Sequence, residues 1–114
     1  MTIEARIGII GGNGWLGNAI AQAAVSSGTL DPSRLTLSGR SEPHGAVRIP
    51  GSFWTKDNAE LVERSDVVVL SVRPEQFSGV RIDLRSKLVV SVMAGVTARA
   101  VEEQTAATRE IRSI

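Results

Sequence analysis

The stretch that decides the fold reads Ile7-Gly8-Ile9-Ile10-Gly11-Gly12-Asn13-Gly14-Trp15-Leu16-Gly17. Its opening four residues are apolar and mostly β-branched, which is typical of a short buried strand. Gly12, Gly14 and Gly17 follow with the spacing G-x-G-x-x-G, and the residues from Leu16 to Val25 have the spacing of a helix. A strand, a glycine-rich turn and a helix in this order form the context in which the motif binds the pyrophosphate of a dinucleotide.

Each glycine of the motif has an expected physical task. The first permits the tight turn, the second lets the backbone approach a pyrophosphate, and the third allows the helix to pack closely on the strand. Unpaired amides at the helix N-terminus then receive the phosphate charge. A merely structural turn is the alternative. Trp15 is left with two readings, a cover over the cofactor or a side chain packed on the protein.

Short apolar runs alternate with helical stretches along the rest of the chain. Further strands are expected at Leu35–Ser38, Val67–Leu70, Leu88–Val92 and Arg109–Ile114, and helices from Asp57 or Asn58 to Glu63 and after Thr97. Strand, helix and strand in repetition predict an α/β fold with helices on both faces of the sheet. The expected architecture is a Rossmann-type, doubly wound and mainly parallel sheet in a single domain.

One segment interrupts this alternation. The residues from Ser41 to Phe53 include two prolines and two glycines, so regular helix is not expected there. At best a short strand is expected near Val47–Ile49. Phe53 and Trp54 are interpreted as a hydrophobic anchor under this loop rather than as a platform for a ligand. His44 is interpreted as a loop residue rather than as an acid.

The composition excludes several classes of site. The chain has 114 residues, no cysteine, one histidine and a formal net charge of +1. Disulfides, thiolate metal ligands and cysteine nucleophiles are therefore absent, and a site that needs two imidazoles is excluded. The balanced charge is unlike that of a nonspecific nucleic-acid binder, and no apolar run approaches a membrane span. We expect a cytoplasmic protein with no metal ligand and no nucleic-acid or membrane partner.

The residues at the end of the second strand are expected to decide between NAD and NADP. Ser38 lies 21 residues after Gly17, where NAD sites usually place a carboxylate that binds the ribose 2′-hydroxyl. This chain has Ser38-Gly39-Arg40-Ser41 there, with no carboxylate before Glu42. A guanidinium flanked by hydroxyls would hold a 2′-phosphate through charge-assisted hydrogen bonds. NADP(H) is therefore favoured over NAD, and an exposed turn with an incidental arginine is the alternative.

Two later segments should approach the same ligand, because a ligand of an open α/β sheet lies at the carboxyl ends of the strands. Ser71-Val72-Arg73-Pro74 follows the strand at Val67–Leu70, and proline biases Arg73 toward an extended conformation. Small residues in Met93-Ala94-Gly95 leave space where a nicotinamide and a flat substrate could meet. Ordinary strand-to-helix connections are the alternative for both segments.

Taken together, these segments resemble the pyrroline-5-carboxylate reductase family, over nearly the whole chain and in unchanged order. The matching pieces are residues 7–17, Asp57-Asn58-Ala59-Glu60, the stretch from Asp66 to Gln76, and Val89-Val90-Ser91-Val92-Met93-Ala94-Gly95-Val96-Thr97. The N-terminal domain of this family is also similar to that of F420-dependent NADP oxidoreductases. The resemblance implies hydride transfer from NADPH to a cyclic imine, in proline biosynthesis.

The resemblance also implies roles for particular residues. The backbone from Gly11 to Leu16 would bind the pyrophosphate, and Ser38 to Arg40 would bind the ribose phosphate. Asn58 occupies the position of a side chain that contacts the cofactor. Ser71 to Pro74 would line the nicotinamide ribose, and Met93 to Gly95 would lie under the ring. Arg73 replaces the usual lysine, which keeps the charge but changes the donor geometry.

The end of the chain departs from the family pattern. In the family, the strand resembling Arg109–Ile114 leads into an active-site loop, and a helical domain follows that forms the dimer and the substrate pocket. Residues 1–114 are therefore expected to be an NADP-binding domain without that C-terminal domain, inactive alone. A cyclic imino acid as substrate and a homo-oligomer are expected only for the complete enzyme. The alternatives are the cofactor domain of an F420-dependent or other NADP oxidoreductase, and a standalone nucleotide-binding regulatory module.

No catalytic residue and no metal ligand are assigned. The residues expected to contact the cofactor are Gly11, Gly12, Asn13, Gly14, Trp15, Leu16, Gly17, Ser38, Gly39, Arg40, Ser41, Asn58, Ser71, Val72, Arg73, Pro74, Met93, Ala94 and Gly95.

Overall fold

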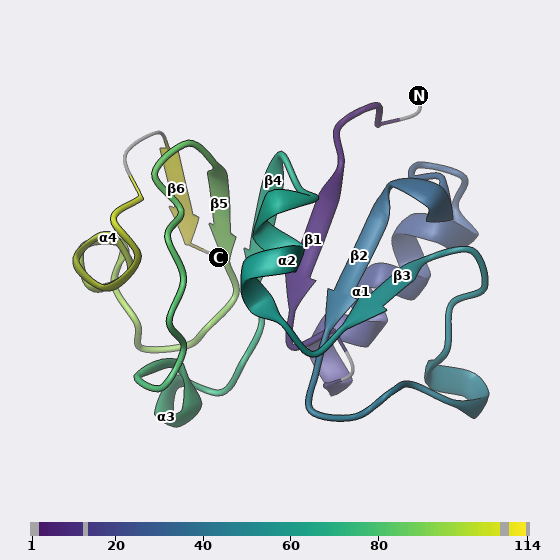
Figure 1. The fold of residues 1–114 in the computed structure, drawn as a ribbon, viewed down its shortest axis with the longest axis horizontal. Coiled ribbons are helices and arrows are strands. Elements are labelled where there is room, and N and C mark those ends of the chain that lie inside the picture. Colours follow the sequence, from purple (N-terminus) through teal and green to yellow (C-terminus); the bar gives the residue numbers. More distant parts are fainter. Residues whose placement is uncertain (1–2, 13, 108–109, 114) are drawn as a thin grey trace.

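The computed structural model of the chain describes residues 3–12, 14–107 and 110–113. Six parallel strands form one sheet in the order β3-β2-β1-β4-β5-β6 (Figure 1). The strands are β1 (Ile7–Ile10), β2 (Leu35–Ser38), β3 (Phe53–Thr55), β4 (Val67–Leu70), β5 (Leu88–Ser91) and β6 (Glu110–Ser113). The helices are α1 (Trp15–Ser26), α2 (Asn58–Glu63), α3 (Pro74–Phe77) and α4 (Ala98–Thr105), with 3₁₀ turns η1 (Pro32–Arg34) and η2 (Gly45–Val47). The expected doubly wound α/β fold is confirmed.

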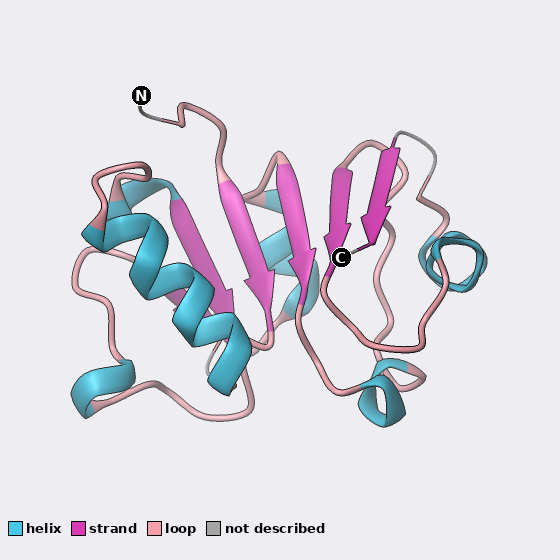
Figure 2. Ribbon diagram, turned by 180° about the vertical axis from the view of Figure 1, so that it is seen from behind, coloured by secondary structure: helices cyan, strands magenta, loops and turns pink. Residues whose placement is uncertain are grey.

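Helices cover both faces of the sheet. In Figure 1, α2 lies in front of the strands, and Figure 2 shows α1 on the opposite face. Helix α4 lies beside β6 in both views, and its Val101 packs in the same core cluster as residues of α2. Successive strand residues point to opposite faces, so Ile9 packs on the α1 side while Ile10 packs with the residues of α2. In the same way Val68 and Val69 belong to different core clusters. This alternation explains why the strands read as continuous apolar runs, because both of their faces are buried.

The strand order creates a single reversal point. From β1 the chain moves outward to β2 and β3, and it then crosses back over the sheet to β4, which pairs with the other side of β1. The connections after β1 and β4 therefore leave the same edge in opposite directions. Ligands of open α/β sheets bind at such a point, outside the carboxyl ends of the strands.

The prediction of a short strand near Val47–Ile49 is wrong. Residues 45–47 form the turn η2, and the third strand is instead β3, which pairs with β2 through Thr36 and Phe53. Ile49 is buried, at 4% exposure, but it contributes its side chain to the core without pairing in the sheet. The aromatic and β-branched run Phe53-Trp54-Thr55 has the composition that favours strands. In that strand, Trp54 packs against the core cluster beneath α1.

Smaller differences concern the ends of elements. The helix expected from Leu16 to Val25 extends by one residue at each end, and the strand expected to end at Val92 ends at Ser91. No bounds were expected for the helix that follows β4. It is the short helix α3, which begins at Pro74, where the missing amide is no loss because it would be unpaired. In the last expected strand, residues 110–113 form β6, whereas Arg109 and Ile114 lie outside the described residues.

Gly8 lets α2 pack directly on β1. A Cβ atom at Gly8 would lie 2.2 Å from Ser65 Oγ and 2.6 Å from Leu61 Cδ2. Both neighbours are fully buried, and Ser65 Oγ donates to the carbonyl of Leu61 at 2.6 Å. Neither side chain has space to move away, so the absence of a side chain at position 8 fixes the distance between helix and sheet.

Substitution Gly8→Ala is expected to lower the free energy of unfolding by about 2–3 kcal/mol, since overpacking of a rigid core has an effect of this size. Gly79→Ala is the matched control, because the nearest atom to a Cβ there is Gln76 O at 3.6 Å. Urea denaturation of the three proteins measures the difference. Equal stability of the two variants would mean that α2 is not held against β1 in this way.

An ion pair links the starts of β1 and β4. Arg6 donates its backbone amide to Asp66 Oδ2 at 2.9 Å and its Nη2 to Asp66 Oδ1 at 3.1 Å. These hydrogen bonds and the guanidinium charge lower the pKa of Asp66 to about 2. The Asp66 side chain is 48% exposed, so solvent screens the pair and its effect on stability is small.

Because the folded-state pKa of Asp66 lies below its ordinary value of 3.8, the pair stabilises the fold above that value and loses this effect as the pH falls toward 2. Asp66→Asn is expected to reduce the free energy of unfolding by at most about 1 kcal/mol at neutral pH. The difference between wild type and variant should shrink as the pH falls. Urea titrations at a series of pH values test this, and a difference that is independent of pH would contradict it.

Candidate functional site

The ends of all six strands lie in one row. The registers pair Thr55 with Ser38, Ser38 with Ile10, and Ile10 with Leu70, and the row continues through Ser91 to Ser113. All connections that follow these residues leave at the same edge of the sheet, the lower edge in Figure 1. The structure therefore brings together the glycine-rich turn and the segments expected to share its ligand, which begin at residues 39, 71 and 92.

The glycine-rich turn is held against the end of β2. The amides of Gly11 and Gly12 both donate to the carbonyl oxygen of Ser38, at 3.2 and 3.0 Å, and the amide of Gly14 donates to the carbonyl of Gly11 at 2.9 Å. The residue in the left-handed region is Gly11, with φ of +85°. The expected assignment of the tight turn to Gly12 is therefore corrected, because Gly11 makes that turn.

Gly12 and Gly17 serve close approach. A Cβ at Gly12 would lie 2.6 Å from Leu37 Cδ2, and one at Gly17 would lie 2.6 Å from the carbonyl oxygen of Gly11. The distance at Gly17 shows that the helix approaches the turn after β1 closely, and the role expected for Gly17 in packing on the strand stays a prediction. At Gly14 the only atom near a Cβ is the Gly11 oxygen, at 3.2 Å, and this residue is exposed. The outer side of the turn is therefore open.

The N-terminus of α1 faces that open side without a cap. Gly14 has no side chain to accept from the first amides of the helix, and no acidic residue occupies its first turn. These amides also have no partner within the helix, and they carry the positive end of the helix dipole. Such a terminus is suited to an anion. Asn13, which was expected to contribute here, lies outside the described residues.

Trp15 projects into solvent from the first turn of α1. Its side chain is 89% exposed, and that of the neighbouring Leu16 is 42% exposed. The alternative that Trp15 packs on the protein is therefore wrong, because the described residues leave its side chain exposed. Trp15 is the first residue of α1, so the exposed indole belongs to the helix terminus itself.

Ser38 connects the turn to α2 as well as to β1. The residue is buried, and its hydroxyl donates to Asn58 Oδ1 at 2.7 Å. Asn58 is the first residue of α2, which Asp57 caps by accepting from the amide of Ala59 at 2.9 Å. Because the amide oxygen of Asn58 accepts from Ser38, its NH₂ group is fixed in orientation. The hydroxyl of Ser38 is thus engaged within the protein.

Two exposed cations follow the neighbouring strands β2 and β3 at this end of the sheet. Arg40 is exposed two residues after β2, and Ser41 beside it is exposed too. The amide of Gly39 donates to the carbonyl of Thr55 at 3.4 Å, which joins the ends of β2 and β3. Lys56 follows Thr55 directly and is also exposed. The sequence prediction missed Lys56 because it placed the third strand at Val47–Ile49, which does not end next to Lys56. The run Phe53-Trp54-Thr55 was the sequence signal that could have identified the strand before Lys56.

On the other side of the reversal point, Ser71 lies under the turn. Its amide donates to the carbonyl of Ile10 at 3.0 Å, and its Oγ is buried without a hydrogen-bond partner among the described residues. A Cβ at Gly17 would lie 3.0 Å from this oxygen. Buried hydroxyls are nearly always satisfied, so an unpaired one beneath the turn is consistent with a ligand or a water. Val72 is half-buried against Gly11, and Arg73 and Pro74 are exposed.

The segment after β5 divides between core and surface. Met93 is 3% exposed and packs in the core cluster on the α2 side, with its amide donating to Ser91 Oγ at 3.3 Å. Ala94 and Gly95 are exposed, and Gly95 has φ of +78° with open space around it. Of the three residues expected under a nicotinamide ring, the last two are therefore at the surface.

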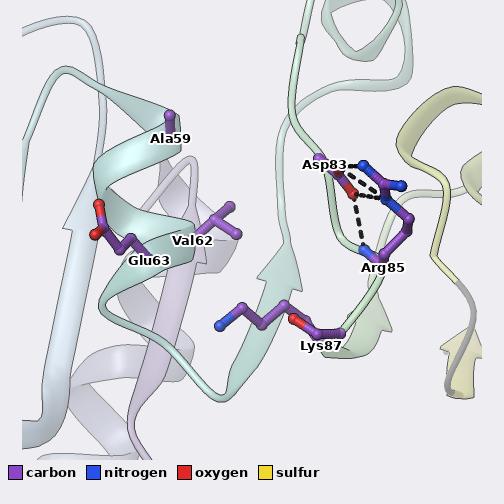
Figure 3. Close-up of a pocket in the computed structure, with 7 residues that line it drawn as sticks. Ala59, Val62, Glu63, Asp83, Arg85 and Lys87 are labelled. Atoms are coloured by element: carbon purple, nitrogen blue, oxygen red, sulfur yellow. Dashed lines mark hydrogen bonds and ion pairs between the residues drawn. The ribbon is translucent and has the colours of Figure 1, made fainter.

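This edge is an open wall rather than a closed pocket. A hollow of about 420 Å³ lies instead between α2 and the segment before β5, where Asp83 and Arg85 form an ion pair (Figure 3). A smaller one of about 220 Å³ lies near the beginning of β2. Neither is lined by a residue that the sequence assigned to the site. Among the described residues, no three metal-ligating side chains gather, and no helix is long and apolar enough to cross a bilayer.

Known proteins resemble the chain over most of its length. The sequence profile of the family described as "NADP oxidoreductase coenzyme F420-dependent" matches residues 6–95. The pyrroline-5-carboxylate reductase of Glycine max is 36% identical over 93% of this chain and 41% of its own length. That of Methanosarcina acetivorans is 32% identical over 86% of this chain and 38% of its own length. The resemblance inferred from the sequence is confirmed, and the chain spans about two fifths of these relatives.

The fold has a counterpart among solved structures. The pyrroline carboxylate reductase of Plasmodium falciparum, solved with NADP bound, superposes with a TM-score of 0.80 at 22% identity, over 97% of this chain and 42% of that one. This likeness concerns the arrangement of strands and helices. The family match over residues 6–95, more than half of the chain, concerns the sequence itself, and the chain therefore belongs to the family of NADP oxidoreductases described as coenzyme F420-dependent.

Proposed function

We propose that the chain binds NADP(H) at the carboxyl edge of its sheet and forms the cofactor-binding part of a pyrroline-5-carboxylate reductase-like oxidoreductase. The observation that carries the proposal is the uncapped N-terminus of α1 behind a turn whose glycines face an open side at the reversal point of the sheet. Backbone amides at such a position are suited to the pyrophosphate of a dinucleotide. The relatives' names supply the class of reaction.

The residues of this edge fit the two halves of the cofactor. The amides of the first turn of α1 would hold the pyrophosphate, with Trp15 beside it and Ser71 Oγ beneath. No carboxylate follows β2 before Glu42, so a 2′-phosphate meets no close negative charge there. Arg40 and Lys56, from neighbouring strand ends, would bind that phosphate, because cations bind it through charge-assisted hydrogen bonds.

The nicotinamide half would lie on the other side of the turn. When bound, the nicotinamide supplies the hydride, and the protein needs chiefly to place the ring and to exclude water. The backbone of Ser71 to Arg73 would run along the ribose up to the start of α3 at Pro74, since the N-cap residue Arg73 is extended, with φ of −66° and ψ of 143°. The small exposed residues Ala94 and Gly95 leave room for the ring. No side chain of this chain is assigned a proton transfer.

The remainder of the proposal concerns the whole protein. A cyclic imino acid as the hydride acceptor follows from the names of the relatives, of which this chain spans about two fifths. Residues 1–114 are treated as one NADP-binding domain, and assembly into a homo-oligomer belongs to the longer enzyme. We also propose a cytoplasmic location. The absence of a nucleic-acid partner is proposed as well, in keeping with a net charge of +1.

A second candidate is the cofactor domain of an F420-dependent NADP oxidoreductase, which the description of the matching family favours. Both candidates use the same cofactor edge, and they differ in the partner of the hydride transfer. Reduction of pyrroline-5-carboxylate by the longer protein supports the first, and NADPH-dependent reduction of F420 supports the second.

The cofactor assignment predicts that the chain binds NADPH more tightly than NADH. Arg40→Ala is expected to weaken NADPH binding about 10-fold, since loss of an exposed charge-assisted hydrogen bond has roughly this effect. NADH affinity should stay unchanged, because NADH has no 2′-phosphate. Calorimetry measures both affinities, and the fluorescence of the exposed Trp15 gives a second readout.

Lys56→Ala tests the second cation in the same way, and Arg81→Ala is the control, because Arg81 is exposed on the segment between α3 and β5. The control should leave both affinities at the wild-type value. An Arg40→Ala protein with unaltered preference for NADPH would refute the assignment of the 2′-phosphate. Absence of any NADPH or NADH binding by the wild-type chain would refute the cofactor site as a whole.

Ser38→Ala tests the orientation of Asn58. The variant leaves Asn58 Oδ1 without its donor, so the free energy of unfolding is expected to fall by about 1 kcal/mol. Affinity for NADPH and NADH should fall together, since Ser38 and Asn58 do not read the 2′-phosphate. Ser52→Ala is the matched control, because Ser52 Oγ donates to the carbonyl of Ile49 at 2.6 Å, away from this edge. If both variants leave cofactor binding intact, Ser38 has a structural role alone.

A further inference from the structure

A second polar hollow lies at the opposite edge of the sheet, where β1 and β2 begin. It has a volume of about 220 Å³ and is lined by Arg6, Ser33, Arg34, Thr36 and Arg64. These residues come from four places: the residue before β1, the turn η1, the strand β2 and the C-cap of α2. Three arginines from separate segments therefore line one small space.

The protein holds each guanidinium but leaves donors unused. Arg64 lies over the ring of Phe53, with its Cζ 3.7 Å from the centroid. This contact occupies no N–H group of Arg64 in a hydrogen bond, so these donors stay available. Arg6 binds Asp66 through Nε and Nη2, and Arg34 donates its Nη1 to the carbonyl of Glu4. Because an arginine has five N–H donors, both retain groups that can bind a ligand.

Positive charge is in excess around this hollow. Asp66 is the carboxylate that pairs with Arg6, and it also feels the charge of Lys87. Asp31 accepts from the amide and the hydroxyl of Ser33, at 2.9 and 2.7 Å, and so caps η1. Arg34 lies close enough to Asp31 to affect its titration, but it forms no ion pair with it within the described residues. Among the described residues, Arg64 has no carboxylate partner.

The size of the hollow limits what it can hold. Pockets for drug-sized ligands and cofactors measure about 300–1,000 Å³, so a hollow of about 220 Å³ is suited to a smaller group. Arginine forks bind planar carboxylates and tetrahedral phosphates through paired hydrogen bonds. The hydroxyl of Thr36, which is 5% exposed, adds a short-range donor on the same wall. The hydroxyl of Ser33 lies on this wall too, but its proton is donated to Asp31.

We propose that this hollow is a phosphate-binding site formed by Arg34, Arg64 and Arg6. It is separate from the cofactor edge, because strands of four residues hold the two edges about 10 Å apart. The ligand is either free inorganic phosphate or the phosphate group of a small ester. The proposal does not depend on the binding of NADP(H), since no residue of the hollow belongs to the carboxyl edge.

Amide NMR of the whole chain tests the site, because the shifts report which edge binds. Inorganic phosphate is titrated at constant ionic strength, and the amides of residues 33–36 and 64–66 should shift with one saturable curve in the millimolar range. Shifts that stay linear in concentration, or that are confined to residues 11–17, would overturn the proposal. A parallel titration with a sugar phosphate separates the two sources: tighter binding of the ester assigns a phosphate ester, and equal or weaker binding assigns free phosphate.

A pair of charge-matched variants supplies the control. The double variant Arg34→Gln/Arg64→Gln is expected to raise the dissociation constant for phosphate at least about 10-fold, since two charge-assisted contacts are lost. Arg81→Gln/Arg99→Gln removes the same charge elsewhere and should leave it unchanged. Equal weakening by both would show nonspecific attraction and would overturn the proposal. The shift map of the wild type decides the question independently if the first double variant is unstable.

Discussion

The carbonyl oxygen of Ser38 accepts hydrogen bonds from two consecutive amides, those of Gly11 and Gly12, and this arrangement fixes the carboxyl edge of the sheet. The two bonds bend the chain sharply at the end of β1, and the left-handed conformation of Gly11 makes the bend feasible. The N-terminus of α1 is consequently directed across the edge. The hydroxyl of the same serine holds Asn58, so the start of α2 is tied to the same point. One buried residue thus relates two helices and two strands.

Close packing around this point leaves little freedom. The space beside Gly12 is filled by Leu37, and that beside Gly17 by the carbonyl of Gly11. The space beside Gly8 is filled by Leu61 of α2 and by Ser65, which follows that helix. Because protein interiors are packed like crystals, a methyl group at any of these positions displaces backbone or a buried side chain. The open side of the turn differs, since Gly14 and Trp15 face solvent. The contrast between a rigid inner side and an open outer side is what a phosphate-binding turn requires.

Much of this could be predicted from the sequence because the relevant signals are local. The run Ile7–Ile10, the glycine spacing and the apolar run Val67–Leu70 each identify an element, and their order determines the topology. The division of work between Gly11 and Gly12 could not be predicted, because adjacent glycines have the same freedom and only the position of Ser38 decides between them. The strand β3 was missed for a different reason. The buried Ile49 gives the signal of a strand but packs without pairing, and Lys56 was overlooked as a consequence.

The two edges of the sheet have opposite electrostatic character, and this bears on the arginines of the amino edge. Helices that connect parallel strands place their positive N-termini at the carboxyl edge and their negative C-termini at the amino edge. Arg64, as the C-cap of α2, complements such a negative end. The end of a helix carries only about half an elementary charge, and α2 is six residues long. One guanidinium is sufficient to balance it, and α1 ends without a basic residue. The charge of Arg6 is paired with Asp66, whereas Arg34 exceeds what the helix requires and lines the same hollow as Arg64.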